Sequence, residues 1–244
     1  YYQLPGDPRR YRDWILRIRG TGHADEMNLR DSIAQSCDVY FYELANRLGI
    51  DALAESLDDF GIGSLTGVDL PSEKPGILPS SEWKRRVIGS NWYGGETLIV
   101  GIGQGYMLAT PMQLAVATTA LATRGTAFKP RFVAAVDGRS VEPEPLLNVS
   151  AETAYWDEVF AGMVDTVSSV RGTAFGMRSG LTYRVAGKTG TAQVVGIAQD
   201  ATYDEEALSE YQRNHGWFIA FAPVENPEIV LAVLTENSGG GSSA

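Results

Sequence analysis

The chain has 244 residues, of which 44% are hydrophobic and 20% charged, and its formal net charge at pH 7 is −10. These values are ordinary for a globular protein with a sizeable core, and the acidic balance argues against nucleic acid as a partner. The single cysteine excludes an intrachain disulfide, and no apolar run reaches the ~18 residues that a membrane helix needs.

The first half of the chain is predicted to be helical with long connections. In chain order we expect a loop at 1–27, a helix at 28–48, a second helix at about 51–60, connections at 62–95 and a third helix at 110–123. Asp51 is the predicted cap of the second helix, and Gly61 follows its end. Thr110 and Pro111 open the third helix, because proline suits the first helical position.

The second half is predicted to mix strands with one helix. In chain order we expect a strand at 128–136, a helix at 152–170, a strand at 182–195, an acidic loop at 197–213 and two strands at 217–223 and 228–235. Asp137-Gly138 and Glu225-Asn226-Pro227 are predicted turns. This order indicates an α/β fold of the α+β type, with an antiparallel sheet flanked by helices and an all-helical part.

One predicted strand carries the run Gly187-Lys188-Thr189-Gly190-Thr191-Ala192-Gln193. An ammonium beside two hydroxyls can hold a carboxylate by charge-assisted hydrogen bonds. Gly190 leaves the strand edge open to an added strand, and the Thr191 N–H could face a developing oxyanion. The alternative is an exposed turn between strands, since such a short run often occurs by chance.

A second run, Ser36-Cys37-Asp38, lies about 150 residues earlier inside a helical pattern, where serine and aspartate are poor choices. It could mark a break that directs side chains into a cleft, with Ser36 passing a proton to a leaving group and Asp38 orienting an amide or ammonium. The alternative is a solvated helix face. We expect Ser36 and Asp38 to face Lys188 across a shared groove.

The two runs and their surroundings resemble the class B penicillin-binding proteins, most closely the penicillin-binding protein 2 subgroup. Asp38 in place of the commoner asparagine fits that subgroup. The likeness extends from about residue 4 to 241. It includes Ser36–Ala45, Thr66–Pro71, Gly101–Tyr106 running into Thr110–Ala115, Gly172–Ala174 and Trp217–Pro223, in this order.

The resemblance implies the penicillin-recognising transpeptidase fold and a peptidoglycan D,D-transpeptidase. Such enzymes form an acyl-enzyme on a serine, expel D-alanine and transfer the acyl group to a second stem-peptide amine, and β-lactams acylate the same serine. Carried over by motif, the catalytic residues would be Ser36, Asp38 and Lys188, and the substrate- and β-lactam-binding residues Thr189, Gly190 and Thr191. No cofactor is implied for catalysis.

The resemblance also implies partners and a location. The partners would be a stem peptide ending in D-Ala-D-Ala, β-lactams, a membrane glycosyltransferase and proteins of the elongation complex. The location would be the periplasm, with an anchor to the inner membrane supplied by a segment outside this chain.

One family motif, Ser-x-x-Lys with the nucleophilic serine, does not precede Ser36. Ser81-Glu-Trp-Lys84 matches the bare pattern but follows Ser36 in a loop-like region, so we interpret it as a chance match. We therefore expect a partial transpeptidase domain over 1–244, with 1–124 mainly helical and 125–244 mainly sheet-bearing. The nucleophile segment, pedestal and anchor would lie outside it, and the chain alone is expected to be inactive.

Asp13, His23 and Cys37 are candidate metal ligands, because aspartate, histidine and cysteine all bind zinc. Their spacing matches no standard zinc signature. The alternative is a free cysteine that behaves as a small hydrophobe, with His23 on the surface. Some proteins of the subgroup hold a zinc ion beside the Ser-x-Asp motif, so the resemblance implies a structural zinc, with a fourth ligand from water or from upstream of Tyr1.

Competing functions stay open at this point. A β-lactamase or β-lactam sensor could use the same fold, and so could a non-catalytic scaffold for cell-wall assembly. The likeness around Gly101–Ala115 favours a transpeptidase. A serine hydrolase built on His215 is disfavoured, because the chain has no Gly-x-Ser-x-Gly elbow, and His215 is expected at a strand end on the surface.

Overall fold

The computed structural model describes residues 1–195 and 208–241. Its helices are α1 Trp14–Arg19, α2 Leu29–Gln35, α3 Asp38–Leu48, α4 Ile50–Asp59, α5 Ser81–Val87, α6 Gly94–Gly101, α7 Pro111–Ala122 and α8 Thr153–Ser168, with short 3-10 turns at Phe175–Arg178 and Glu210–Gln212. Its strands are β1 Thr126–Phe128, β2 Ala135–Val136, β3 Arg139–Ser140, β4 Pro145–Asn148, β5 Ala186–Ala192, β6 His215–Ala222 and β7 Ile229–Thr235. The acidic loop predicted at 197–213 lies mostly outside the described residues.

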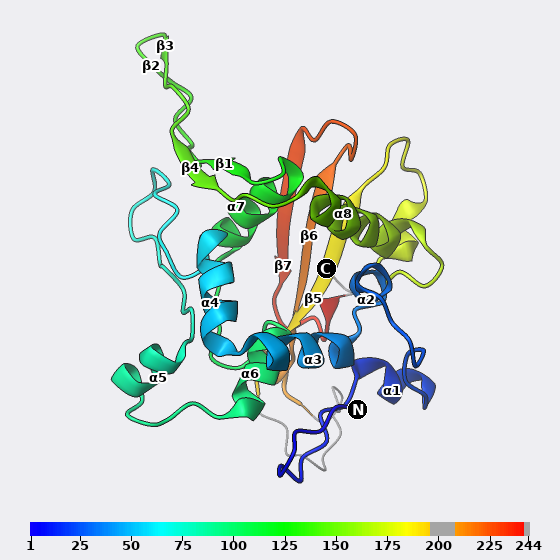
Figure 1. Cartoon of the computed structure of the whole chain (residues 1–244). Coiled ribbons are helices and arrows are strands. Elements are labelled where there is room, and N and C mark those ends of the chain that lie inside the picture. The colour runs from blue at the N-terminus through cyan, green and yellow to red at the C-terminus, as the bar shows by residue number, and fades with distance from the viewer. Residues whose placement is uncertain (196–207, 242–244) are drawn as a thin grey trace.

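The main sheet is antiparallel and has the strand order β5-β6-β7, so β5 is an edge strand of the sheet as described. The register places Lys188 opposite Ile219 and Thr191 opposite Gly216. Figure 1 shows α7 and α8 beside this sheet, with α3 crossing near its lower end. The predicted α+β class, with helices flanking an antiparallel sheet, is confirmed.

The principal core joins helices and sheet from both halves of the chain. Phe160 of α8 packs against Phe221 of β6 in a tilted arrangement, with ring centroids 4.9 Å apart. Gly162 of α8 allows close approach to α2, because a Cβ at this position would lie 2.8 Å from the Ile33 Cβ. The buried residues of this core are Ile33, Ala122, Phe160, Met163, Ala186 and Phe221.

Local signals placed several elements correctly. Thr110 caps α7 through its side chain, which accepts a hydrogen bond from the Gln113 N–H, and Pro111 is the first helical residue. The predicted helix at 152–170 is α8, and the two predicted strands near the C-terminal end are the β6-β7 hairpin. Where caps and periodicity agree, the local preference and the fold coincide.

Other predicted boundaries are wrong. The single helix expected at 28–48 is two helices, α2 and α3, separated at Ser36-Cys37. Asp51 is not the cap of α4, because α4 begins at Ile50 and Gly49 precedes it. The connections expected at 62–95 contain α5, whose cap is Ser80.

The strand expected at 128–136 is also wrong as one element. Only Phe128 belongs to β1, and Ala135–Val136 form β2, which pairs with β3 across the Asp137-Gly138 turn. The segment instead forms an arm that projects from the body of the molecule (Figure 1). Asp69 holds the base of this arm, since its carboxylate accepts hydrogen bonds from the N–H groups of Phe132 and Val133 at 2.7 and 2.8 Å.

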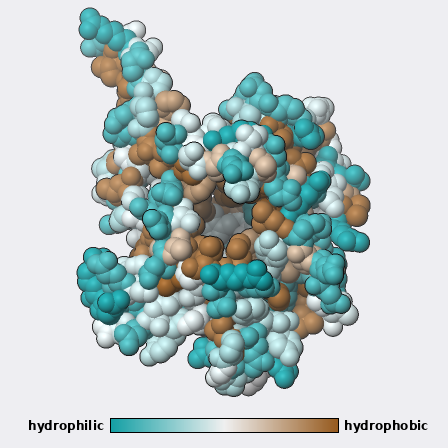
Figure 2. Space-filling model, viewed as in Figure 1, coloured by the Kyte–Doolittle hydropathy of each residue, from teal (hydrophilic) through white to brown (hydrophobic). Residues whose placement is uncertain are grey.

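The surface is hollowed on the face seen in Figure 1. Figure 2 shows a hollow at the centre of this face, bordered by apolar side chains and lying over the sheet between α3, α4 and α8. Among the described residues, no helix combines the length and apolar character required to cross a bilayer.

Candidate active site

A break between two helices places the first motif. Ser36 ends α2 in the left-handed conformation, with φ 56° and ψ 53°, and its N–H bonds to the Ile33 carbonyl. Cys37 then precedes α3, which begins at Asp38. Residues other than glycine adopt this conformation rarely, so the surrounding packing must hold Ser36 there. The break predicted from these poor helix formers is present.

The two motifs meet across the fold. The Lys188 Nζ donates to the Ser36 Oγ at 2.8 Å and to the Thr189 carbonyl at 2.8 Å, although Ser36 and Lys188 are 152 positions apart in the chain. The expected juxtaposition of the Ser-x-Asp and Lys-Thr-Gly segments is therefore present.

Burial shifts the pKa values of Asp38 and Lys188 away from their ordinary values. Burial raises the pKa of Asp38 to about 7, with the Asp13 charge acting in the same direction, while the Trp14 N–H and Lys188 oppose the shift. Burial lowers the pKa of Lys188 to about 8, and the Asp38 charge opposes that shift. The Asp38 carboxylate accepts a hydrogen bond from the Trp14 N–H at 3.1 Å, which fixes its orientation.

Strand β5 pairs with β6 along one edge, and its other edge is free of a strand partner among the described residues. Thr191 pairs with Gly216, but the Gly216 N–H donates to the Ser238 Oγ and its carbonyl accepts from the Thr235 Oγ1, both on the β7 side. Thr191 and Gly216 therefore form a non-hydrogen-bonded pair of the antiparallel ladder. The N–H and C=O of Thr191 consequently point away from β6, toward the free edge.

Neighbouring segments support the rest of the Lys-Thr-Gly run. The hydroxyls of Thr173 and Thr189 lie 2.7 Å apart, and the Thr191 Oγ1 accepts from the Gly241 N–H at 3.0 Å. Gly241 packs directly on Gly190, since a Cβ on Gly241 would lie 2.2 Å from the Gly190 carbonyl oxygen. These contacts hold β5 through segments other than its strand partner β6.

Three candidate metal ligands gather behind the Ser-x-Asp break. One ligand atom from each of Asp13, His23 and Cys37 lies within 4.8 Å of the other two. The His23 Nδ1 is 3.2 Å from the Asp13 Oδ2, and both side chains are 5% exposed, so the alternative that put His23 on the surface is wrong. Burial, aided by the Asp13 charge, raises the pKa of the Cys37 thiol to about 12.

The Ser81-x-x-Lys84 match has a structural role. Lys84 is 2% exposed, and its Nζ lies 2.5 and 2.7 Å from the two Glu96 carboxylate oxygens, which ties α5 to α6. A lysine held in this ion pair is not available as a base, which agrees with the interpretation as a chance match. His215 is half-buried and accepts from the Asn237 N–H through Nδ1, so the expectation of a surface position is only partly correct.

Two residues at the site were not singled out from the sequence. Trp14 contacts both ends of the Ser-x-Asp motif, because its N–H donates to Asp38 and its indole N–H donates to the Ser36 carbonyl at 2.7 Å. Gln104 donates to the Thr191 carbonyl at 3.2 Å. No local pattern marks Trp14, whereas Gln104 lies in the Gly101–Tyr106 segment that carried part of the family resemblance.

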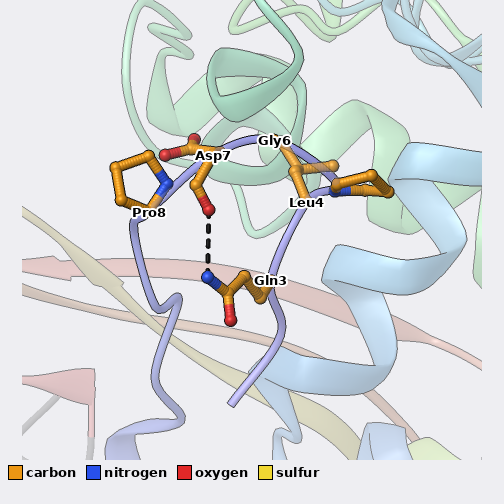
Figure 3. Close-up of a pocket in the computed structure, with 6 residues that line it drawn as sticks. Gln3, Leu4, Gly6, Asp7 and Pro8 are labelled. Carbon is orange, nitrogen blue, oxygen red and sulfur yellow. Dashed lines mark hydrogen bonds between the residues drawn. The ribbon is translucent and has the colours of Figure 1, made fainter.

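A hollow at the turn of residues 3–8 contains none of these groups. Figure 3 shows it as a loop closed by the Gln3 Nε2, which donates to the Asp7 carbonyl at 3.0 Å. The site described above is formed instead by α2, α3 and β5.

Comparisons with known proteins agree with this geometry. Residues 2–244 match the penicillin binding protein transpeptidase domain family. The peptidoglycan D,D-transpeptidase MrdA of Acinetobacter baumannii is 45% identical over 249 aligned positions, covering 100% of this chain and 36% of that protein. The chain thus spans about a third of this curated relative.

Solved structures show the same fold. Pseudomonas aeruginosa PBP2, determined with the compound WCK 5153, has a TM-score of 0.83 and 40% identity, covering 99% of this chain and 50% of that one. Helicobacter pylori PBP2 in complex with MreC has a TM-score of 0.80 and 34% identity, covering 97% and 40%. The chain belongs to the penicillin-binding protein transpeptidase family.

Proposed function

We propose that this chain forms part of the acyl-transfer site of a peptidoglycan D,D-transpeptidase, which cross-links stem peptides ending in D-Ala-D-Ala and is acylated by β-lactams. The observation that carries the proposal is the 2.8 Å contact between the Lys188 Nζ and the Ser36 Oγ, beside the free edge of β5. The family match and the D,D-transpeptidase relative support the same reaction class.

Lys188 supplies the positive charge for substrate recognition. With a pKa of about 8, it is mostly an ammonium at pH 7. The terminal carboxylate of a stem peptide, or the carboxylate of a β-lactam, pairs with this ammonium and with the hydroxyls of Thr189 and Thr191. Charge-assisted hydrogen bonds of this kind are about twice as strong as neutral ones.

Ser36 is the proton carrier in this proposal. The Lys188 ammonium has no acceptor capacity, so the Ser36 oxygen accepts from it and keeps its own O–H free to donate. That hydrogen can pass to the nitrogen of the departing D-alanine. Asp38, at the first turn of α3, orients the neighbouring ammonium by its charge.

The acylation step needs a serine nucleophile, which we assign to a part of the protein outside this chain. Its oxygen attacks the carbonyl carbon of the penultimate D-alanine and gives up its proton, the peptide C–N bond breaks, and the terminal D-alanine leaves with a proton from Ser36. The proton released by the nucleophile replaces the one that Ser36 has lost. The Thr191 N–H faces the oxygen that becomes negative. Losing one such donor typically costs about 2.7–4 kcal/mol. A second stem-peptide amine then cleaves the ester and restores the serine.

We also propose that Asp13, His23 and Cys37 hold a structural zinc ion. The oxygen, nitrogen and sulfur donors suit zinc, and their ligand atoms already lie within 4.8 Å of one another. A bound zinc would cross-link the segment around α1 to the Ser-x-Asp break and take no part in the acyl transfer. Metal analysis of the purified protein tests this, with about one zinc per chain expected and its loss expected in His23→Ala.

The proposal extends to the partners and the location of the intact protein. We propose that the intact protein works in the periplasm, anchored to the inner membrane, with a membrane glycosyltransferase and elongation-complex proteins. Support comes from the H. pylori complex with MreC, a structure that aligns over 97% of this chain. Co-purification of the intact protein with MreC of the same organism tests the partner.

The reaction is tested by labelling with a fluorescent penicillin. We expect the longer protein that contains the upstream serine to form a covalent adduct, and this chain alone to form none. Lys188→Met should slow labelling by about 100-fold, because it removes both the charge that pairs with the carboxylate and the donor that positions the Ser36 hydroxyl. A stable adduct supports a transpeptidase. Rapid release of the label would indicate a β-lactamase, and absence of any adduct would leave a non-catalytic scaffold.

A further inference from the structure

One side chain crosses from the helical part of the fold to β5. Gln104 lies in the loop between α6 and α7, and its Nε2 donates to the Thr191 carbonyl at 3.2 Å, 87 positions further along the chain. This carbonyl faces the free edge of β5, on the same side as the Thr191 N–H. Gln104 therefore holds the residue that we assign as oxyanion donor.

The position of Gln104 is set by the turn that carries it. Gly103 and Gly105 on either side have φ values of 78° and 73°, and the Gln104 N–H bonds back to the Ile99 carbonyl of α6 at 3.1 Å. Glycine adopts positive φ without steric cost, so this turn can project the glutamine away from α6 without strain.

The same helix packs closely on the helix that carries the Ser-x-Asp motif. A Cβ at Gly101 of α6 would lie 2.4 Å from the Ala45 Cβ of α3. Asp38 is the first residue of α3 and Ser36 lies just before it. Through α6 and α3, Gln104 is thus connected to the wall of the cleft opposite Lys188.

Thr191 needs such support, because β5 ends one residue later at Ala192 and has no strand partner on this edge among the described residues. Without this donor, the Thr191 carbonyl would bond to water, and the direct tie between the end of β5 and the loop after α6 would be lost.

We propose that Gln104 is a positioning residue for acyl transfer, holding the Thr191 peptide at a fixed distance from the Ser-x-Asp wall by a donated hydrogen bond. The proposal rests on the proposed function, since it takes the Thr191 N–H as the oxyanion donor. Gln104 acts through Thr191 and does not need to touch substrate.

The test compares three substitutions in the longer protein that contains the upstream serine. Gln104→Ala removes the side-chain amide, Gln104→Glu keeps its size but replaces the donor with an acceptor, and Gln104→Lys keeps a donor. For each, the dissociation constant Kd of a fluorescent penicillin and the first-order acylation constant k2 are measured separately, together with the melting temperature.

The expected results distinguish the effect of losing the hydrogen-bond donor at position 104 from the effect of changing the charge there. We expect k2 to fall about tenfold or more in Gln104→Ala and Gln104→Glu, with unchanged melting temperature and a Kd within about threefold for Gln104→Ala. Gln104→Lys should recover k2 to within about threefold of the unsubstituted protein. Tenfold in k2 corresponds to about 1.4 kcal/mol in the activation free energy.

The matched control is Gln3→Glu. It removes the same kind of contact, from a glutamine Nε2 to a backbone carbonyl, at the turn of residues 3–8 shown in Figure 3. It should leave k2 unchanged.

Two results would overturn the proposal. One is an unchanged k2 in both Gln104→Ala and Gln104→Glu. The other is a lower k2 combined with a higher Kd and a lower melting temperature in both variants, which would show a role in folding only. Failure of the proposed function is distinguished from both, because then the unsubstituted protein would not be labelled.

Discussion

At the scale of single residues, burial decides how Lys188 can act. Its pKa of about 8 lies below the ordinary value of 10.5, because removal from water disfavours the ammonium. As an ammonium, Lys188 has three N–H donors, so that two can go to Ser36 and Thr189 while one donor and the full positive charge remain for a carboxylate. In the proposed function, recognition of a carboxylate is therefore tied to protonation of one half-buried lysine.

The first prediction concerns pH. Acylation by a carboxylate-bearing β-lactam should fall as the pH rises from 7 to 9, because Lys188 loses its proton near pH 8. Between about pH 8 and 10.5 the unfolded chain binds more protons at this residue than the folded chain, so its contribution to the free energy of unfolding rises with pH. Between pH 8 and 9, activity should therefore fall while the Lys188 contribution to stability rises, as followed by labelling rates and by urea denaturation of the protein and of Lys188→Met. A parallel loss of activity and stability would contradict the assignment.

Lys129→Met, on the exposed arm, is the control for this prediction and should leave the pH profile of labelling unchanged.

The second prediction separates the backbone of Ser36 from its hydroxyl. Ser36→Gly should be more stable than Ser36→Ala by about 1 kcal/mol, because glycine adopts the left-handed conformation without steric cost. Both variants lose the contact with Lys188 and should label more slowly than the unsubstituted protein. Chemical denaturation gives the stabilities. Equal stabilities would show that the left-handed conformation at Ser36 carries little strain.

At the scale of elements, the packing of α6 on α3 supports the Ser-x-Asp wall. Gly101 leaves no room for a side chain, since a Cβ would lie 2.4 Å from the Ala45 Cβ. The close approach lets α3 present Asp38 at its N-terminal end while α6 presents the turn of Gln104. The geometry of the cleft therefore depends on a helix contact outside it.

The third prediction tests that contact. Gly101→Ala should lower the free energy of unfolding by about 1–3 kcal/mol, the usual cost of overpacking, and should slow acylation by displacing α3. Gly176→Ala is the matched control, because a Cβ at Gly176 would meet nothing within 4 Å. Thermal or urea unfolding measures both. A Gly101→Ala protein as stable and as active as the control would show that the two helices adjust without cost.

At the scale of the whole molecule, helices and sheet share a core that crosses the boundary expected near residue 124. Ile33 and Ala122 come from the first half and Phe160, Met163, Ala186 and Phe221 from the second. Neither half can bury these residues alone. The mainly helical part and the mainly sheet-bearing part are thus two regions that share one core.

The fourth prediction follows from this shared core. The protein should unfold in one transition, with coincident curves from tryptophan fluorescence and far-ultraviolet circular dichroism. Segments 1–124 and 125–244 produced separately should show no cooperative transition. Phe221→Ala should destabilise both parts together, by about 3–5 kcal/mol. Independent cooperative unfolding of either segment would contradict the shared core.

Local patterns in the amino-acid sequence were enough to predict several helices and strands and to identify the family. Thr110-Pro111 marked the start of α7, because a cap and a proline act within one turn, and alternation marked β6 and β7. Each of the two motifs is a short run of neighbouring residues, and the two runs together with their surroundings identified the transpeptidase family.

The residues that those motifs contact become apparent only in the folded chain. Lys188 reaches Ser36 over 152 positions, Gln104 reaches Thr191 over 87, and Trp14 reaches Asp38 over 24. The helix at 28–48 had to break at Ser36, although apolar periodicity continues through it. The physical reason is the same in each case: periodicity and caps act over a few residues, whereas burial, helix contact and hydrogen bonding between distant segments exist only in the folded chain.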